Sequence, residues 1–297
     1  MVLNYKTFRN ILQCSQENLK VILSNFLKYK GYEEVINEDG FVYAKGDIPI
    51  LLVAHLDTVH RQKPSEIYYD KKQGIMWSPQ GIGGDDRCGV YGICEILRTH
   101  KPSILFTEDE EIGGIGASKA VKILEKPEVK FMIELDRRGQ NDCVFYDCEN
   151  KDFQEYIKGF GFEKQWGSFS DICTLSKAWD LASVNLSIGY QREHTEKEII
   201  NVNDMLETCR KVINILDDKD ERCFDYQEKK YDYKYTSYYD YLNYSGEKGK
   251  PKKGEEADYL WYDEIGFVSA ETGYYYDWEQ YDIYLDDVKK SVKMEEK

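Results

Sequence analysis

The sequence predicts an α/β fold in which a mixed, mostly parallel sheet carries helices on both faces. Over residues 1–216, short apolar runs of strand length alternate with segments whose apolar residues recur at helical spacing. The strand-like runs are almost continuously apolar, as in the LLVA stretch at 51–54, which is typical of strands covered on both faces. This alternation indicates one sheet enclosed by helices.

The N-terminal part of the chain predicts two helices, a hairpin and a third helix. Residues 4–32 show helical spacing in two pieces. Residues 40–57 predict a hairpin, because a strand, a Lys-Gly-Asp turn and a second apolar strand follow one another. Residues 85–100 predict a helix, because their aliphatic residues fall on one side.

The rest of this region continues the alternation of strands and helices. The predicted elements are strand 103–109, helix 116–126, strand 129–136, helices near 152–160 and 170–179, strand 182–190 and helix 201–218. Together these elements predict a first domain over residues 1–216.

The composition changes after residue 216. Residues 217–297 contain 22 acidic and 13 basic residues, so they contribute −9 of the formal net charge of −15, and they hold 15 of the 25 tyrosines. The SGEKGKPKKGEE stretch is typical of a flexible linker. We therefore expect a tyrosine-rich, acidic C-terminal appendage that is only partly ordered.

The composition also excludes several classes of protein. The net charge of −15, with no basic cluster to offset it, argues against binding to nucleic acid or to an anionic membrane. No apolar stretch reaches the roughly 18 to 20 residues that span a bilayer, and the N-terminus does not have the pattern of a secretory signal. Eight scattered cysteines without a CxxC pair favour reduced thiols and a cytoplasmic location.

Acidic and imidazole groups follow the predicted strands at the points where those strands end. They are His55 and Asp57, Asp85 in a glycine-rich turn, Glu110 and Glu111, Asp136 and His194. Ligands of an open α/β sheet bind beyond the carboxyl ends of its strands. Several carboxylates gathered there would repel one another unless cations neutralised them. Two histidines with several carboxylates suit two divalent ions, with zinc expected and cobalt or manganese as alternatives.

Five short motifs in this order resemble those of the co-catalytic di-zinc exopeptidases. The strings are HLD, GIGGDDRCG, EEIGGIGA, ELD and HTEKE, which lie between about residues 50 and 200. They are similar to the motifs of aminopeptidases, glutamyl aminopeptidases, peptidase T-like tripeptidases and amino-acylases. The resemblance implies the α/β core of the zinc exopeptidases.

The resemblance also implies how the metals are held. His55 and Asp136 would bind one ion, Glu111 and His194 would bind the other, and Asp85 would bridge the two. These five residues are the metal ligands that we expect.

Two further residues would act on the reaction without binding metal. Glu110 would be the general base, taking a proton from water and passing it to the leaving amine. Asp57 would hold His55 in its liganding tautomer or steer the base. The resemblance further implies a cis peptide bond between Asp85 and Asp86.

Insertions found in many relatives have no room in this chain. Some relatives carry a lid or dimerisation domain between the fourth and fifth ligands, and others carry a barrel between the first and second. Here Asp136 and His194 are 58 positions apart, and His55 and Asp85 are 30 apart. We therefore expect a compact catalytic domain with no inserted lid domain.

The function expected is that of a zinc-dependent exopeptidase of the aminopeptidase type, acting on short peptides, with a homo-oligomer left open. The alternatives are an N-acyl amino acid deacylase or carboxypeptidase-like hydrolase and, in another class, an inactive relative that serves as a binding module. Arg137 and Arg138, which follow a ligand, would either pair with a substrate carboxylate or neutralise nearby acids. Asp86 is expected to cap the following helix, and Glu198 to fix the loop of His194.

Overall fold

The computed structural model describes residues 1–229, 259–262, 266–269 and 275–277. The chain divides into two compact units, Met1–Lys230 and Tyr231–Lys297. The first unit contains the predicted site. Of the second unit, the described residues form a three-stranded antiparallel sheet with the order β13-β14-β15; its strands are Tyr259–Tyr262, Gly266–Ser269 and Tyr275–Asp277.

An eight-stranded mixed sheet forms the centre of the first unit, in the order β1-β2-β6-β3-β7-β10-β8-β9. The strands are β1 (Val35–Glu38), β2 (Phe41–Ala44), β3 (Ile48–His55), β6 (Pro102–Thr107), β7 (Met132–Arg137), β8 (Asp142–Val144), β9 (Glu163–Lys164) and β10 (Ser183–Ser187). Four neighbouring pairs are parallel, namely β3·β6, β3·β7, β7·β10 and β8·β9, and the other three are antiparallel. This confirms the predicted mixed, mostly parallel sheet.

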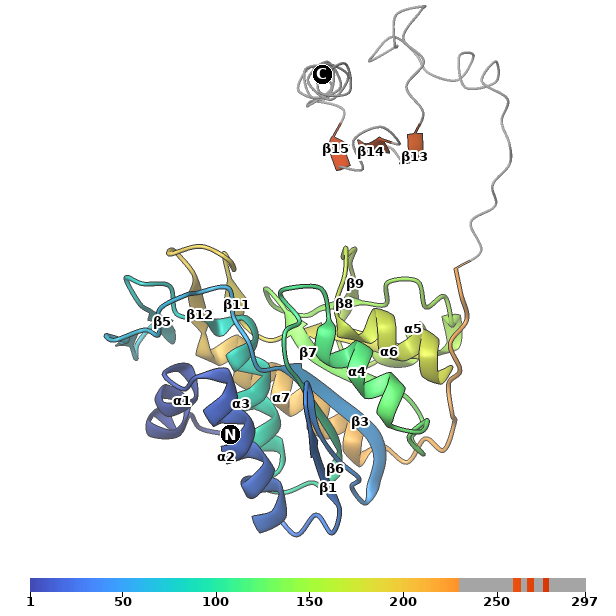
Figure 1. Ribbon diagram of the computed structural model, residues 1–297, viewed down its shortest axis with the longest axis horizontal. Coiled ribbons are helices and arrows are strands. Elements are labelled where there is room, and N and C mark those ends of the chain that lie inside the picture. The colour runs from blue at the N-terminus through green and yellow to red at the C-terminus, as the bar shows by residue number, and fades with distance from the viewer. Residues whose placement is uncertain (230–258, 263–265, 270–274, 278–297) are drawn as a thin grey trace, which may run out of the picture. The chain divides into compact units, whose positions relative to one another are not determined.

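Helices cover both faces of the sheet. They are α1 (Tyr5–Leu12), α2 (Gln16–Tyr29), α3 (Gly84–Ile96), α4 (Ile115–Ile123), α5 (Lys151–Lys158), α6 (Asp171–Trp179) and α7 (Val202–Asp217). Figure 1 shows α3 and α7 on one side of the central strands and α4 and α6 on the other. Alternate residues of β3 serve the two faces, because Leu52 and Ala54 belong to the core under α3, whereas Leu51 and Val53 belong to the core under α4 and α6. A continuously apolar strand is the consequence of burial on both faces.

The predicted hairpin over residues 40–57 is wrong. β2 pairs with β1 in an antiparallel hairpin and, on its other edge, with β6, whereas β3 pairs in parallel with β6 and β7. β6 therefore lies between β2 and β3. The short turn between β2 and β3 suggested that these two strands pair with each other. In the interior of the sheet, β3 instead pairs with two parallel neighbours.

A second, four-stranded antiparallel sheet was not predicted from the sequence. It has the order β11-β12-β5-β4, with β4 (Tyr68–Asp70), β5 (Ile75–Trp77), β11 (Tyr190–Gln191) and β12 (Ile199–Asn201). Such strands of two or three residues are too short to show a periodicity. The β11–β12 connection matters for the site, since it contains His194. Between Asp136 and His194 the chain forms β8, α5, β9, α6, β10 and β11, and the absence of an inserted lid stays a prediction.

Residues 218–229, which the sequence assigns to the appendage, pack against the first unit. Phe224 is 4% exposed, and its ring contacts those of Phe131, Phe153 and Tyr156. Its backbone N–H donates to the carbonyl of Lys130 at 2.9 Å. The first unit thus extends to residue 230 rather than ending at 216. Most of the tyrosine-rich stretch lies outside the described residues.

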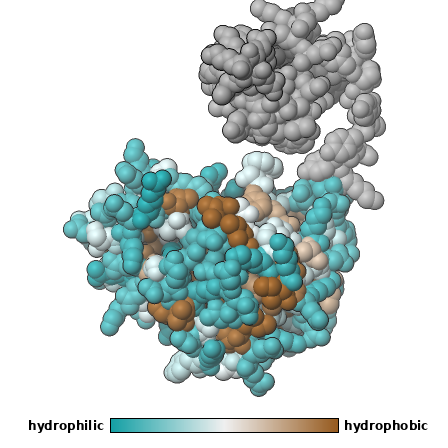
Figure 2. Space-filling view, viewed as in Figure 1, coloured by the Kyte–Doolittle hydropathy of each residue, from teal (hydrophilic) through white to brown (hydrophobic). Residues whose placement is uncertain are grey.

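The face of the first unit seen in Figure 2 is mainly hydrophilic, with apolar side chains in a few separate groups. Scattered exposed apolar residues are normal on a globular protein and do not form a broad docking surface on this face. Within the described residues, no helix combines the length and the apolar composition needed to cross a bilayer.

Candidate metal centre and active site

The predicted site residues come together at one edge of the central sheet. His55 is the last residue of β3, Asp136 is the next-to-last residue of β7, and Glu110 and Glu111 follow β6. β3 lies between β6 and β7 and is parallel to both, so the carboxyl ends of the three strands lie at the same edge. Two other residues reach the same edge from elsewhere, namely Asp85 at the start of α3 and His194 in the β11–β12 connection, and complete the set.

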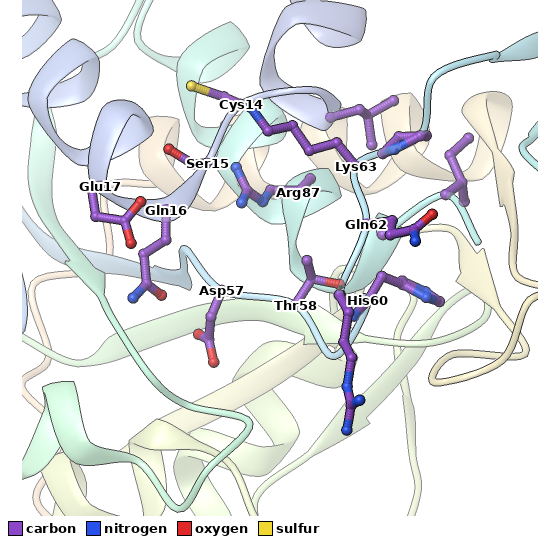
Figure 3. Close-up of a pocket in the computed structure, with 15 residues that line it drawn as sticks. Cys14, Ser15, Gln16, Glu17, Asp57, Thr58, His60, Gln62, Lys63 and Arg87 are labelled. Atoms are coloured by element: carbon purple, nitrogen blue, oxygen red, sulfur yellow. Dashed lines mark hydrogen bonds between the residues drawn. The ribbon is translucent and has the colours of Figure 1, made fainter. Parts of the chain in front are cut away.

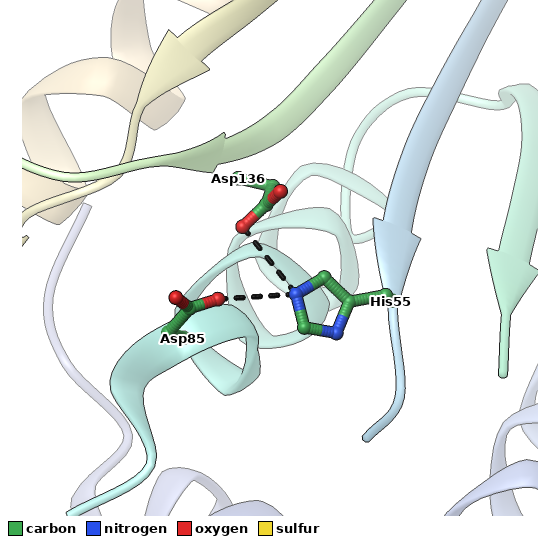
Figure 4. Close-up of side chains that lie close together, drawn as sticks. All are labelled: His55, Asp85 and Asp136. Carbon is green, nitrogen blue, oxygen red and sulfur yellow. Dashed lines mark hydrogen bonds and ion pairs between the residues drawn. The ribbon is translucent and has the colours of Figure 1, made fainter. Parts of the chain in front are cut away.

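The first group of ligand atoms belongs to His55, Asp85 and Asp136. The Nε2 atom of His55 lies 3.0 Å from Oδ1 of Asp85 and 3.4 Å from Oδ1 of Asp136. Figure 4 shows both carboxylates pointing toward that ring nitrogen. The three ligand atoms lie within 4.8 Å of one another, close enough to contact one ion.

The second group belongs to Asp85, Glu111 and His194. The Nε2 atom of His194 lies 3.2 Å from Oδ2 of Asp85 and 3.0 Å from Oε2 of Glu111. Asp85 therefore presents Oδ1 to the first group and Oδ2 to the second. That arrangement is the one required of a carboxylate that bridges two ions, and it is the role that the sequence predicts for Asp85.

The donor set fits a pair of divalent cations. Burial, together with the negative charge of Asp85, raises the pKa of both Asp136 and Glu111 to about 7. Oε1 of Glu111 is buried and has no hydrogen-bond partner among the described residues. Clustered carboxylates with an unused oxygen are costly unless a cation neutralises them. Imidazole nitrogens and carboxylate oxygens are the ligands that zinc, cobalt and manganese accept.

Asp57 holds two parts of the site in place. Its Oδ1 lies 3.1 Å from Nδ1 of His55, and its two oxygens accept the backbone N–H groups of Glu110 and Glu111, each at 3.0 Å. Burial opposes its ionisation, but the hydrogen bond to His55 lowers the pKa of Asp57 below its ordinary value. Because an ionised Asp57 only accepts, Nδ1 of His55 carries a proton, and Nε2 is the ring nitrogen that faces Asp85 and Asp136.

Glu110 lines a cavity of about 220 Å³ together with Asp85, Glu111, Asp136 and His194. Burial and the negative charge of Asp136 raise the pKa of Glu110 to about 9. Its carboxyl group is thus desolvated beside the ligand groups. A bound cation would favour the ionised form of Glu110, which is the form that accepts a proton.

Glu198 supports the turn that carries Asp85. This side chain is 1% exposed, and its oxygens accept the backbone N–H of Gly83 at 2.8 Å and that of Asp85 at 3.0 Å. The same carboxylate lies 3.0 Å from Nε2 of His60. The sequence predicts that Glu198 fixes the loop of His194. In the structure Glu198 belongs to that loop and its hydrogen bonds tie the loop to the turn that carries Asp85.

Two residues of the β10–β11 region position Asp136, and the sequence did not identify either. The side-chain amide of Asn185 accepts from the backbone N–H of Asp136 at 2.9 Å and donates to its carbonyl at 2.7 Å. The hydroxyl of Tyr190 donates to Oδ1 of Asp136 at 3.0 Å. An amide side chain between the apolar Val184 and Leu186 of β10 was a signal that could have identified Asn185.

Asp86 caps the helix that follows, as predicted. Its Oδ1 accepts the backbone N–H of Gly89 at 2.9 Å, and Oδ2 accepts that of His55 at 3.3 Å. The peptide bond between Asp85 and Asp86 is cis, as the resemblance implies.

A neighbouring cavity of about 270 Å³ lies on the other side of Asp57. Figure 3 shows the side chains that line it, among them Glu17, Arg87 and His60. Asp57 is the one predicted site residue that lines this cavity. Four of the five expected ligands, namely Asp85, Glu111, Asp136 and His194, instead line the 220 Å³ cavity.

No protein-family model matches the chain, and no curated protein matches it in sequence. Solved structures do match it. Aminopeptidase PepT from Bacillus cereus is 15% identical with a TM-score of 0.59, over 71% of this chain and 96% of that one. A tripeptidase from Staphylococcus aureus is 14% identical with a TM-score of 0.59, over the same shares.

A third match comes from an archaeon. The TET1 peptidase from Pyrococcus horikoshii, which can assemble into a tetrahedron or a large octahedral shell, is 12% identical with a TM-score of 0.50, over 68% of this chain and 94% of that one. The chain therefore shares its fold with these peptidases, and the fold implied by its motifs is confirmed.

Proposed function

We propose that this protein is a metal-dependent amide hydrolase, of the exopeptidase class and the aminopeptidase type. The observation that carries the proposal is the position of Asp85, whose two oxygens lie 3.0 Å and 3.2 Å from Nε2 of His55 and of His194. A carboxylate shared in this way between two ligand groups suits a two-metal site. The peptidases of the same fold support the reaction class.

In this proposal two divalent cations, with zinc first and cobalt or manganese as alternatives, occupy the site. His55 and Asp136 hold one, Glu111 and His194 hold the other, and Asp85 is shared. When bound, such cations supply Lewis acidity toward the scissile carbonyl and lower the pKa of water.

The chain's own groups then perform the proton transfers and the positioning. Glu110 takes a proton from the attacking water and gives it to the leaving amine, so that one carboxylate serves as base and then as acid. Asp57 fixes the backbone of Glu110 and Glu111 and the tautomer of His55. Glu110 can thereby face the substrate while its neighbour Glu111 faces the metal.

The proposal is tested by metal analysis combined with Glu110→Gln. The purified protein should bind about two divalent ions per chain, and E110Q should keep them but lose turnover by at least a hundredfold. A panel of aminoacyl, peptidyl and N-acyl substrates then separates an aminopeptidase from a deacylase or carboxypeptidase-like enzyme. A protein that binds metal but hydrolyses none of them would instead be an inactive relative that acts as a binding module.

Two further proposals concern the setting of the enzyme. All eight cysteines are free, which supports a reducing compartment such as the cytoplasm. The assembly of the Pyrococcus horikoshii peptidase supports a homo-oligomer here, which light scattering on the purified chain would test.

A further inference from the structure

Two consecutive arginines follow Asp136, and both line the 220 Å³ cavity that contains Glu110. Their surroundings differ. The side chain of Arg138 is 57% exposed, and its Nη1 donates to Oε1 of Glu193 at 2.6 Å. The charge of Arg138 is thus paired within the chain.

Arg137 is paired less closely, through a longer ion pair with Asp142. Its side chain is 19% exposed, and its Nε is buried without a hydrogen-bond partner among the described residues. The carboxylate of Asp142 approaches it, but Oδ2 lies 3.9 Å from Nε, which is beyond hydrogen-bond distance. A largely buried guanidinium with an unused donor is costly until an acceptor reaches it.

The chemistry of the guanidinium group indicates what that acceptor is. Its planar fork of N–H donors matches a carboxylate, which it binds through two parallel hydrogen bonds. The other charges of the cavity would allow an anion there. Two divalent cations would carry +4 against −4 for the carboxylates of Asp85, Glu110, Glu111 and Asp136, so the positive charge of Arg137 would remain to attract an anion.

The cavity also limits the size of the occupant. Its volume of about 220 Å³ is below the roughly 300 to 1,000 Å³ of pockets for drug-sized ligands. Trp166 and Phe169 also line it and are 71% and 45% exposed, so they offer aromatic surface to an apolar side chain. The cavity thus suits a small molecule that combines an apolar group with a carboxylate.

We infer that Arg137 determines specificity by binding a free carboxylate on the residue that leaves as the amine. This inference rests on the proposed function and narrows its substrates to very short peptides, or N-acyl amino acids, whose released residue carries that carboxylate. The carboxylate has two sources, the C-terminal α-carboxylate or an acidic side chain, and both present the same chemistry to Arg137.

The first test compares Leu-Leu, Leu-Leu amide and Leu-Glu amide as substrates of the zinc-loaded wild type, R137Q and R138Q. Wild type should prefer Leu-Leu to its amide by about ten- to hundredfold in kcat/KM, as expected for one charged hydrogen-bonded pair. In R137Q the ratio should fall to near one, whereas R138Q should keep it. If the wild type hydrolyses both Leu-Leu and Leu-Glu amide faster than Leu-Leu amide, a side-chain carboxylate is a second source. If it hydrolyses only Leu-Leu faster than Leu-Leu amide, the C-terminal carboxylate is the source.

Equal kcat/KM for Leu-Leu, Leu-Leu amide and Leu-Glu amide in the wild type would overturn the inference, and so would a preference in R137Q as high as in the wild type. Circular dichroism checks that the variants fold. If R137Q does not fold, R137M replaces it, because methionine keeps the aliphatic part of the side chain without the charge.

A binding measurement separates this inference from the proposed function. Calorimetry would compare the binding of Leu-Leu, Leu-Leu amide and Leu-Glu amide to zinc-loaded E110Q and to E110Q/R137Q. If E110Q binds Leu-Leu more tightly than Leu-Leu amide and E110Q/R137Q does not, the role of Arg137 is supported. This holds even if the wild type hydrolyses neither peptide and the proposed function fails. Equal binding of Leu-Leu, Leu-Leu amide and Leu-Glu amide to E110Q overturns the role of Arg137, even if hydrolysis is observed.

Discussion

Glu198 bonds to the backbone of Asp85, with Oε1 3.0 Å from the amide nitrogen of the bridging ligand. Its other oxygen accepts from Gly83 at 2.8 Å and lies 3.0 Å from His60. The buried carboxylate of Glu198, which is distant in sequence from Asp85, thus fixes the turn that carries Asp85. Both ligand groups include Asp85, so both depend on this turn. Residues that orient metal ligands commonly matter nearly as much as the ligands themselves.

Replacing Glu198 with glutamine should weaken metal binding by about ten- to hundredfold. Glutamine has a single oxygen, so its NH₂ group would face one of the two backbone N–H donors that Glu198 now accepts. Affinity is measured by competition with a chromogenic chelator. E196Q is the matched control, since Glu196 is an exposed acid of the same loop. Equal affinities of E198Q and wild type would contradict a role for Glu198 in holding Asp85.

Asp57→Asn should affect both the metal and the catalytic base. Both oxygens of Asp57 accept hydrogen bonds, from the His55 ring and from the backbone N–H groups of Glu110 and Glu111. In asparagine one of these oxygens is replaced by an NH₂ group, which donates and cannot accept. We expect metal affinity to fall about ten- to hundredfold and kcat to fall further at saturating metal. Titration calorimetry and steady-state kinetics measure the two effects. A kcat like that of the wild type at saturating metal would show that Asp57 does not position Glu110.

The metal-free protein should lose stability as the pH rises from about 5 to 9. Burial raises the pKa of Glu110 to about 9, and that of Glu111 and Asp136 to about 7, while a hydrogen bond to Asp85 raises the pKa of His194 to about 9. Groups whose pKa is raised by folding bind more protons in the folded state, so their stabilising effect is present at low pH and is lost as they ionise.

Thermal melts of the chelated and the zinc-loaded protein across this pH range measure the effect. Zinc should remove most of the decline, because the ligands are then paired with a cation and bind it in their deprotonated forms. A melting temperature of the metal-free protein that rises toward pH 9 would show that the site carboxylates are not in conflict with one another.

Two truncations should show that the residues around Phe224 stabilise the first unit and that the residues beyond Lys230 do not. Removing 231–297 should leave the melting temperature and metal binding of the first unit nearly unchanged, because the first compact unit ends at Lys230. Removing 218–297 should lower the free energy of unfolding by about 3 kcal/mol or more, since the buried ring of Phe224 is lost. F224A in the full chain is the matched variant and should show a similar loss. Equal melting temperatures for the two truncations would contradict this boundary.

Much of the site was predictable because its residues lie at the ends of apolar runs. A buried strand that ends in His55 or Asp136 buries a polar group, which destabilises the fold unless a partner binds that group. An apolar run followed by such a residue can be recognised from neighbouring positions in the sequence. The alternation of strand and helix patterns also predicted the parallel core that brings such ends together. The assignment of five expected ligands, by contrast, rests on the resemblance of the motifs to those of the di-zinc exopeptidases.

Other features depended on contacts between distant residues. The position of β6 between β2 and β3 was not predictable from a short turn, and the partners of Glu198 are more than one hundred residues away in sequence. The difference between Arg137 and Arg138 depends on Glu193, which reaches only the second of them.

The sequence by itself determined which residues end the strands, and hence which chemistry gathers at the edge of the sheet, because burial of an apolar run is a property of neighbouring residues. The tertiary structure alone decided that both ligand groups meet at the carboxylate of Asp85, that Glu198 holds the backbone of Asp85, and that Arg138 rather than Arg137 has a close carboxylate partner. Those outcomes depend on distances of 3 to 4 Å between segments that only the packed sheet brings together.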